Sequence, residues 1–450
     1  LSAPIVEHTT TNPFDEYFED LDIPIGGTSP VNVGLHNIVS SINSAAEDDR
    51  IKGIYLNLNS GVQTGWANLT TIRKALIDFK NSGKFIYAYA EIMDEKAYYL
   101  SSTANAIHMA SRGILEFNGL SSNPTFLKGM LDKLDVKPKV FKVVTFKSAV
   151  EPYIREDMNP ENREQVEQYI GAIWNKFLTD IALSRNMDQQ QLNELANSFI
   201  LGDGSKALKV GLADADGTEE DVFNAMKAAL GKDSEDKLSL LSFKKYLKVP
   251  SSEIPFSSNK IAVIVAEGTI NSGKSSAGTA GSESIVKALR KARKDPNVKG
   301  VVLRVNSPGG SALASSVISN EIKLLREKKP VVASMGDVAA SGGYYISAPC
   351  DKIFAQPNTI TGSIGIFSVL WDATDAMKSN LGVTFDEVET NPSANIGLPF
   401  YKLSAGEERF LQSWTERGYG DFIGVVKDGR DFADSAAVDK LAQGRVWIGA

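Results

Sequence analysis

The sequence predicts an α/β protein that contains one fold twice, each copy with a mainly parallel sheet, βαβ units and a helical extension. KGIYLNL at 52–58 resembles KGVVLRV at 299–305, and Asn-Ser follows both. YYLS at 98–101 resembles YYIS at 344–347, at nearly the same separation of about 246 residues. Strand and helix patterns alternate in both copies, which is the rhythm of βαβ crossovers. A tandem repeat therefore explains both the order of these matching segments and their nearly constant separation.

The length of 450 residues gives the same domain count. A single hydrophobic core stops growing well below this size, so two domains are expected. We predict an N-terminal repeat over 1–230, a linker over 231–258 rich in Lys, Ser, Asp and Glu, and a C-terminal repeat over 259–450. The chain begins with Leu1 and stops at Ala450 in mid-pattern, so we expect a piece of a longer protein.

The second copy has the clearer element pattern. A β-branched apolar run predicts a strand over 260–270, and helical spacing predicts a helix over 284–294. The following elements are a strand over 300–305, a turn over 307–310, a helix to about 328, a strand over 330–334, a turn at Gly336-Asp337, a helical segment within 339–347 and a short strand over 352–355.

The first copy repeats this order. We expect strands over 53–58, 84–90 and 106–109, and helices over 66–82 and 94–104. Each copy then continues into a longer helical tail, over 160–184 and 404–429.

Composition excludes several classes of function. A net charge of −7 without a Lys/Arg run argues against a nucleic-acid partner. A single cysteine rules out an intramolecular disulfide framework and a CxxC site. None of the three histidines lies beside Asp or Glu at ligand spacing, so neither a metal site nor a Ser-His-Asp triad is supported. We expect no metal and no other cofactor.

Ser341 is the candidate nucleophile. It lies in AASGGY at 339–344, where a Gly-rich turn meets a predicted helix, and its small neighbours let a substrate backbone come close. A helix N-terminus supplies unpaired N–H groups and positive potential, which acyl transfer needs near the attacking oxygen. The alternative is an ordinary N-cap serine in a tight turn.

A second glycine turn favours the catalytic interpretation. NSPGGS at 306–311 ends a predicted parallel strand, where α/β folds place their ligands. Backbone N–H groups of Gly310 and Gly342 would form an oxyanion hole. Alternatively the segment is only a turn, and it lacks the Gly-Lys-Ser/Thr ending of a phosphate-binding loop.

Lys147 is the candidate base, because no histidine is suitably placed. Its sequence neighbours are apolar, and burial can lower a lysine pKa from about 10.4 toward 7 to 8. The second copy has Ala394 at the matching position, and the first has Glu95 where the second has Ser341. One complete site therefore needs both halves of the chain. The alternative is a surface lysine on a strand.

These motifs together resemble the signal peptide peptidase A family, in its long duplicated bacterial form. The segments are PGG at 308–310, MGDVAASGGYYIS at 335–347, TGSIGI at 361–366 and TFKSAVEPY at 145–153. The resemblance implies tandem domains of the Clp-protease/crotonase superfamily. It also implies a serine endopeptidase that degrades cleaved signal peptides and other hydrophobic or unfolded peptides through a Ser-Lys dyad and an acyl-enzyme intermediate.

By the same resemblance, Ser341 is the nucleophile, Lys147 the general base, Ser363 the serine that orients the lysine, and Gly310 and Gly342 the oxyanion donors. Apolar residues would line the substrate trough: Val338, Ala339 and Ile364. The implied protein is a homo-oligomer, expected to be a tetramer, in the bacterial inner membrane. It would be held there by a segment outside this chain, and its catalytic part would face the periplasm.

Two other functions stay open at this point. A crotonase-like acyl-CoA hydratase or thioesterase would use the same kind of oxyanion hole, and CoA-thioester turnover that survives Ser341→Ala would favour it. A non-catalytic module that assembles membrane partners would bind signal-like peptides without turnover.

Overall fold

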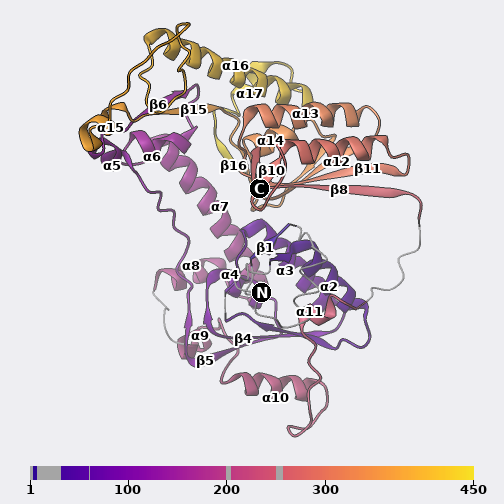
Figure 1. The fold of residues 1–450 in the computed structure, drawn as a ribbon. Helices are drawn as coiled ribbons and strands as arrows, with labels where there is room; N and C mark the ends of the chain where they lie inside the picture. Colours follow the sequence, from indigo (N-terminus) through magenta and orange to yellow (C-terminus); the bar gives the residue numbers. More distant parts are fainter. Residues whose placement is uncertain (1–3, 8–31, 60, 199–203, 250–256) are drawn as a thin grey trace. The chain divides into compact units, whose positions relative to one another are not determined.

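Figure 1 shows the computed structural model, which describes residues 4–7, 32–59, 61–198, 204–249 and 257–450. The chain forms two compact units that are not consecutive halves of the sequence. Unit 1 comprises Leu1–Leu120, Ile173–Ser257 and Gln356–Asn358, and unit 2 comprises Ser121–Ala172, Ser258–Ala355 and Thr359–Ala450. The bounds 1–230, 231–258 and 259–450 concern the sequence repeat and stay a prediction. Residues 250–256 of the expected linker lie outside the described residues.

Unit 1 contains a parallel sheet with strand order β3-β4-β5-β7 and a short parallel pair, β1 with β2. Its core is apolar and aromatic, with Tyr98, Tyr99 and Phe177 among the fully buried side chains. The strands are β1 (Ile5–Val6), β2 (Val33–Gly34), β3 (Gly53–Asn57), β4 (Phe85–Met93), β5 (Ala106–Leu115) and β7 (Ala215–Asp216). The helices are α2 (Leu35–Glu47), α3 (Trp66–Asn81), α4 (Glu95–Ser101), α8 (Gln189–Asn197), α9 (Gly204–Lys209), α10 (Glu219–Ala229) and α11 (Phe243–Tyr246).

Unit 2 is built on a six-stranded sheet with order β16-β14-β12-β11-β8, in which β13 also pairs with β12. Neighbouring strands are parallel except β16, which runs antiparallel to β14. A parallel pair, β9 with β10, completes these strands. Their bounds are β8 (Lys260–Glu267), β9 (Thr269–Asn271), β10 (Thr279–Gly281), β11 (Val298–Ser307), β12 (Val331–Ala340), β13 (Lys352–Phe354), β14 (Ile360–Gly362) and β16 (Val446–Ile448).

Three helices pack on this sheet. Helix α12 lies against β8, α14 against β12, and α13 packs between these two helices (Figure 1). Alternating burial along β11 and a stripe of buried Ile and Leu on α13 explain the packing. The helices of unit 2 between residues 282 and 439 are α12 (Ser282–Lys294), α13 (Ala312–Arg326), α14 (Gly342–Ser347), α15 (Thr374–Leu381), α16 (Ala405–Gly429) and α17 (Ser435–Asp439).

An antiparallel ribbon brings residues 121–172 into unit 2. Strand β6 (Lys137–Lys142) pairs with β15 (Phe367–Asp372), so that Phe141 lies opposite Ser368. The other elements of this segment are α5 (Lys128–Lys133), the 3₁₀ turn η1 (Ser148–Val150), α6 (Glu151–Ile154) and the start of α7 (Pro160–Arg185). Because Lys147 comes shortly after β6, this pairing decides which unit carries it.

The α/β class with mainly parallel sheets and βαβ units is confirmed, and so are the two helical tails, α7 and α16. The turn expected at Gly336-Asp337 is wrong, because β12 continues to Ala340. The pairing of β12 with β11 shifts register between Met335 and Ala339, an irregularity that resembles a bulge. Beyond this irregularity, residues 338–340 pair with β14 instead of β13. Gly336 therefore lies where β12 changes its pairing partner from β13 to β14.

Candidate active site

Ser341 lies at the sharp turn between β12 and α14. Its φ of 54° and ψ of −119° fall where non-glycine residues are rare, at a cost of about 1 to 3 kcal/mol. The backbone is held there because Ser341 N–H donates to Gly362 O at 2.9 Å and Tyr345 N–H donates to Ser341 O at 2.8 Å. The turn places the serine at the carboxyl end of a parallel strand, directly before a helix.

The turn after β11 lies against this serine. A Cβ on Gly309 would come within 2.5 Å of Gly342 N and 2.8 Å of Ser341 Cβ, so only glycine fits. A Cβ on Gly342 would lie 3.3 Å from Gly310 N, so the two predicted oxyanion donors are neighbours. Among the described residues, no hydrogen-bond partner is found for either amide N–H. Two free donors beside a serine hydroxyl can bind the oxyanion of a tetrahedral intermediate.

Lys147 reaches the same place from the turn between β6 and η1. Its Nζ lies 3.1 Å from Ser341 Oγ, 2.9 Å from Ser363 Oγ and 2.9 Å from Ser363 O. The residue is 4% exposed and is not on a strand, so the alternative of a surface lysine is wrong. All three residues belong to unit 2.

Burial lowers the pKa of Lys147 from its usual 10.5 to about 8. Desolvation disfavours the ammonium ion, and it is the only cause of the shift. The contacts fit the neutral amine, which has two N–H donors and one lone pair. Ser363 O and Oγ can accept the two hydrogens, which leaves the lone pair facing the Ser341 hydroxyl. The arrangement can therefore take a proton from that serine.

The turn before β16 packs against the lysine. Gln443 O accepts from Phe146 N–H at 2.9 Å, and Arg445 O accepts from Ser363 N–H at 2.7 Å. Gly444 lies between these contacts with a φ of 72°, and a Cβ there would lie 2.8 Å from Lys147 N. Sequence reasoning missed this turn. Its one available signal was the Gln-Gly pair at 443–444, a common turn pattern with no chemistry of its own.

The predicted trough residues are less exposed than an open trough would require. Ala339 is fully buried in the apolar core and Ile364 is 5% exposed, while Val338 is half-buried. Val338 N–H donates to Asn306 Oδ1 at 3.1 Å, which ties it to the turn after β11. Their contact with substrate stays a prediction.

The matching positions of the repeat lack this chemistry. Glu95 is the first residue of α4, and its Oε1 accepts from Asn118 N–H at 3.1 Å. Burial raises the pKa of Glu95. Ala394 lies in the loop between α15 and α16. A cleft of about 480 Å³ beside Glu95 belongs to unit 1 and is lined by Val62, Gln63, Trp66, Asp94, Glu95, Lys96, Glu116 and Leu120.

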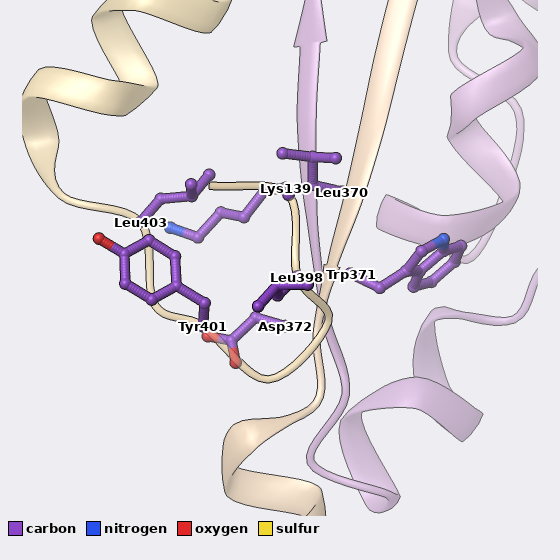
Figure 2. A pocket seen from close by; sticks show the side chains of 8 residues that line it. Lys139, Leu370, Trp371, Asp372, Leu398, Tyr401 and Leu403 are labelled. Carbon is purple, nitrogen blue, oxygen red and sulfur yellow. The ribbon is translucent and has the colours of Figure 1, made fainter. Parts of the chain in front are cut away.

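Another hollow of unit 2 lies on the β6–β15 ribbon and contains none of the predicted site residues. Figure 2 shows Lys139 from β6 and Tyr401 from the loop before α16 at this hollow. Lys139 Nζ also forms an ion pair with Glu408 at 2.7 Å. The hollow is lined by Lys139, Leu370, Trp371, Asp372, Gly397, Leu398, Tyr401 and Leu403.

In the part of the chain that the structure describes, no three His, Cys, Asp or Glu side chains gather as metal ligands. No helix within the described ranges is both long enough and apolar enough to cross a bilayer.

Comparisons with known proteins agree with the motifs. The model of "Peptidase family S49" matches residues 78–232 and 323–450. "Protease 4" of Haemophilus influenzae is 39% identical over 435 residues, which cover 93% of this chain and 69% of that relative. "Protease 4" of Salmonella typhi is 40% identical over 425 residues, 92% of this chain and 68% of that relative. "Serine protease SPPA, chloroplastic" of Arabidopsis thaliana is 30% identical over 430 residues, 93% of this chain and 62% of that relative.

One solved structure is also similar in part. A mutant ClpP1 of Listeria monocytogenes has a TM-score of 0.25 and 16% identity, over 40% of this chain and 77% of that chain. So low a score adds nothing to the fold described above.

Proposed function

The chain belongs to peptidase family S49 and is a serine peptidase, and from this premise we propose that Ser341 and Lys147 form its catalytic dyad. The observation that carries the proposal is the 3.1 Å distance between the Lys147 Nζ and the Ser341 Oγ at a lysine that is 4% exposed. A nucleophile and base within hydrogen-bond reach, with the base held by a third group, are the usual parts of covalent catalysis.

The contacts support the following proposed reaction. Neutral Lys147 takes the Ser341 proton as Oγ attacks the scissile carbonyl carbon, and the N–H groups of Gly310 and Gly342 stabilise the oxyanion. The resulting lysine ammonium then protonates the leaving amine, and an acyl-enzyme on Ser341 remains. Water attacks the ester, Lys147 accepts a proton from that water and returns one to Ser341 Oγ, and the acid product leaves. Ser363 keeps Nζ directed at Ser341 in each step.

For substrates, we propose cleaved signal peptides and other hydrophobic or unfolded peptides. The motif resemblance supports this class, and we propose that Val338, Ala339 and Ile364 contribute to substrate binding. Two bacterial relatives indicate a bacterial protein. By the same resemblance we propose a membrane-associated homo-oligomer, a tetramer, whose active site faces the periplasm. Large apolar side chains exposed on unit 2, among them Val388, Phe410 and Trp414, support assembly.

The dyad is tested by labelling with a fluorophosphonate probe, which bonds covalently to an activated serine. We expect wild-type protein to be labelled, Ser341→Ala to be unlabelled, and Lys147→Ala to be labelled at least about 100-fold more slowly, the usual contribution of a positioned base. Lys139→Ala removes a lysine of the same unit outside the site and serves as the matched control. Labelling of Lys147→Ala at the wild-type rate would exclude Lys147 as the base.

A further inference from the structure

A buried glutamine on α7 contacts both neighbours of the proposed base. Gln165 is 3% exposed. Its Nε2 lies 3.2 Å from Phe146 O and 3.0 Å from Ser148 Oγ, and these two residues flank Lys147 in the chain. The same nitrogen, which has two N–H donors, also lies 3.1 Å from Asn162 Oδ1 on the preceding turn of α7, so the three acceptors share its two hydrogens. One amide therefore fixes the backbone on one side of the lysine and the side chain on the other.

The carbonyl end of this amide holds a different segment. Gln165 Oε1 accepts from Val446 N–H at 3.1 Å, and Val446 is the first residue of β16. Val446 pairs with Gly362 of β14, directly before Ser363. Gln165 thus links the loop that carries the base to the strand pair that carries the lysine-orienting serine.

We propose that Gln165 is a positioning residue for the peptidase reaction, which fixes the separation of the Lys147 loop from Ser363 and keeps water out of the space between them. The inference rests on the proposed role of Lys147. Gln165 contacts no reacting atom, so it acts only through Phe146, Ser148 and Val446.

Neighbouring contacts keep α7 attached without this amide. The Arg445 guanidinium lies 4.7 Å from the Phe146 ring centroid and 5.0 Å from that of Trp447. Its Nη2 donates to Glu164 at 2.6 Å and to Gln168 at 2.7 Å. A variant of Gln165 should therefore fold while losing the exact spacing of the base.

The test is Gln165→Met, which keeps the length of the side chain and removes its hydrogen bonds. Wild-type and variant proteins are compared in peptide hydrolysis from pH 6 to 10, with rates normalised to the fraction of protein that a fluorophosphonate titrates. We expect kcat to fall roughly 10- to 100-fold, the effect of a misplacement of about 1 Å, with KM nearly unchanged. We also expect the acid limb of the rate profile to move to higher pH, because water reaching Lys147 restores its ammonium form.

A merely structural glutamine gives a different result. It would lower the melting temperature and the titratable fraction, but the normalised kcat and the acid limb would stay at wild-type values, and this outcome overturns the proposal. Gln190→Met is the matched control, because Gln190 is an exposed glutamine on α8 whose amide reaches only Glu194 of its own helix.

Ser148→Ala decides the question if Gln165→Met does not fold. It removes one acceptor of the Gln165 amide at a half-buried position, and we expect a smaller shift of the acid limb in the same direction. An unchanged limb in a folded Ser148→Ala variant overturns the proposal. Failure of the dyad is recognised separately, because Lys147→Ala would then keep its labelling rate.

Discussion

At the scale of single residues, the pKa of Lys147, the proposed base, is lowered without a charged partner. Its pKa falls through desolvation alone, while its nearest polar neighbours are a carbonyl and two hydroxyls. Ser363 O and Oγ can accept hydrogen bonds from the amine, and none of the three groups adds positive charge. The fold therefore makes Lys147 easier to deprotonate at the expense of stability, because burial disfavours the ammonium ion that the unfolded chain leaves in water.

That expense predicts a pH dependence of stability. Between pH 8 and 10.5 the unfolded chain binds a proton at Lys147 that the folded chain does not, so the contribution of this residue to stability rises with pH across that window and is constant below it. We expect the free energy of unfolding of wild type minus that of Lys147→Met to rise by roughly 3 kcal/mol from pH 7 to pH 10.5. Denaturant unfolding at four pH values measures it.

Lys139→Met provides the control for this experiment, because it removes a half-buried lysine of the same unit that lies outside the site. If the difference in unfolding free energy between wild type and Lys147→Met does not vary from pH 7 to 10.5, then Lys147 keeps its proton in the folded chain across that range.

The sequence was enough to select the residues that meet in the candidate site, but not the residues that hold them in place. Ser341 and Gly310 lie in glycine-rich turns of recognisable pattern, and the repeat drew attention to Lys147. Gln165 and Gln168 look alike in the sequence, because both are polar residues of a charged helix. Gln165 is the buried one, because Phe146, Ser148 and Val446 come together around its side-chain amide in the fold.

At the scale of elements, the short strand β16 and the turn before it hold both the Lys147 loop and Ser363. Strand β16 pairs with β14 through residues 446–448, and the turn before it contacts both Phe146 and Ser363 through backbone hydrogen bonds. Gly365 packs on the same turn, since a Cβ there would lie 2.9 Å from Gly444 Cα. The spacing of base and orienting serine is therefore a property of this turn.

The turn gives a direct test in Gly444→Ala. Its positive φ costs about 1 kcal/mol for alanine, and the new methyl group must displace the backbone of Lys147, 2.8 Å away. We expect a loss of about 1 to 3 kcal/mol in stability and at least a tenfold loss of kcat, measured by denaturant unfolding and peptide hydrolysis.

The control for Gly444→Ala is Gly420→Ala in α16, where an added Cβ meets no atom within 4 Å and the backbone is helical. This change should leave kcat unaltered and raise stability by roughly 0.5 to 1 kcal/mol. Equal kcat in Gly444→Ala and wild type would mean that the Lys147 loop tolerates displacement.

Local sequence patterns do not predict the end of a strand correctly where pairing with a distant strand determines it. The Gly336-Asp337 pair predicts a turn, yet Thr359 Oγ donates to Gly336 O at 2.9 Å and the strand runs on to Ala340. The longer β12 is what brings Ser341 level with Gly362. No signal within residues 330–340 reveals this, because it depends on β14 arriving at the same edge.

At the scale of the whole molecule, the repeat in the sequence and the compact units of the structure divide the chain differently. Residues 121–172 belong to the first copy by sequence order, but the β6–β15 ribbon places them in unit 2. By the repeat, the two residues of the proposed dyad come from different copies, which stays a prediction. The repeat gave no sign that they share one unit, because strand pairing between residues 137–142 and 367–372 has no signature in either segment.

Because both residues of the proposed dyad lie in unit 2, we can predict the result of cutting the chain at a site in unit 1 that lies between them in the sequence. A protease site inserted between Lys232 and Lys237, which are exposed, separates Lys147 from Ser341 in the chain and leaves unit 2 assembled. We expect the nicked protein to keep its peptidase activity. After denaturation and separation, neither fragment should hydrolyse peptide alone, and recombined fragments should recover activity.

Uncut protein taken through the same denaturation and refolding controls for losses in handling. Activity in the isolated fragment that begins after the cut would show that hydrolysis does not need Lys147.

The antiparallel pairing of β16 with β14 also sets an order in time. A ribosome adds Lys147 and Ser341 long before Gln443 to Ile448, so a growing chain carries both reactive side chains without the strand that aligns them. Unpaired, the Ser363 and Phe146 backbones lack the acceptors that hold them. In a growing chain, the Lys147 loop and Ser363 therefore gain these backbone contacts only after residues 443–448 have been made and paired.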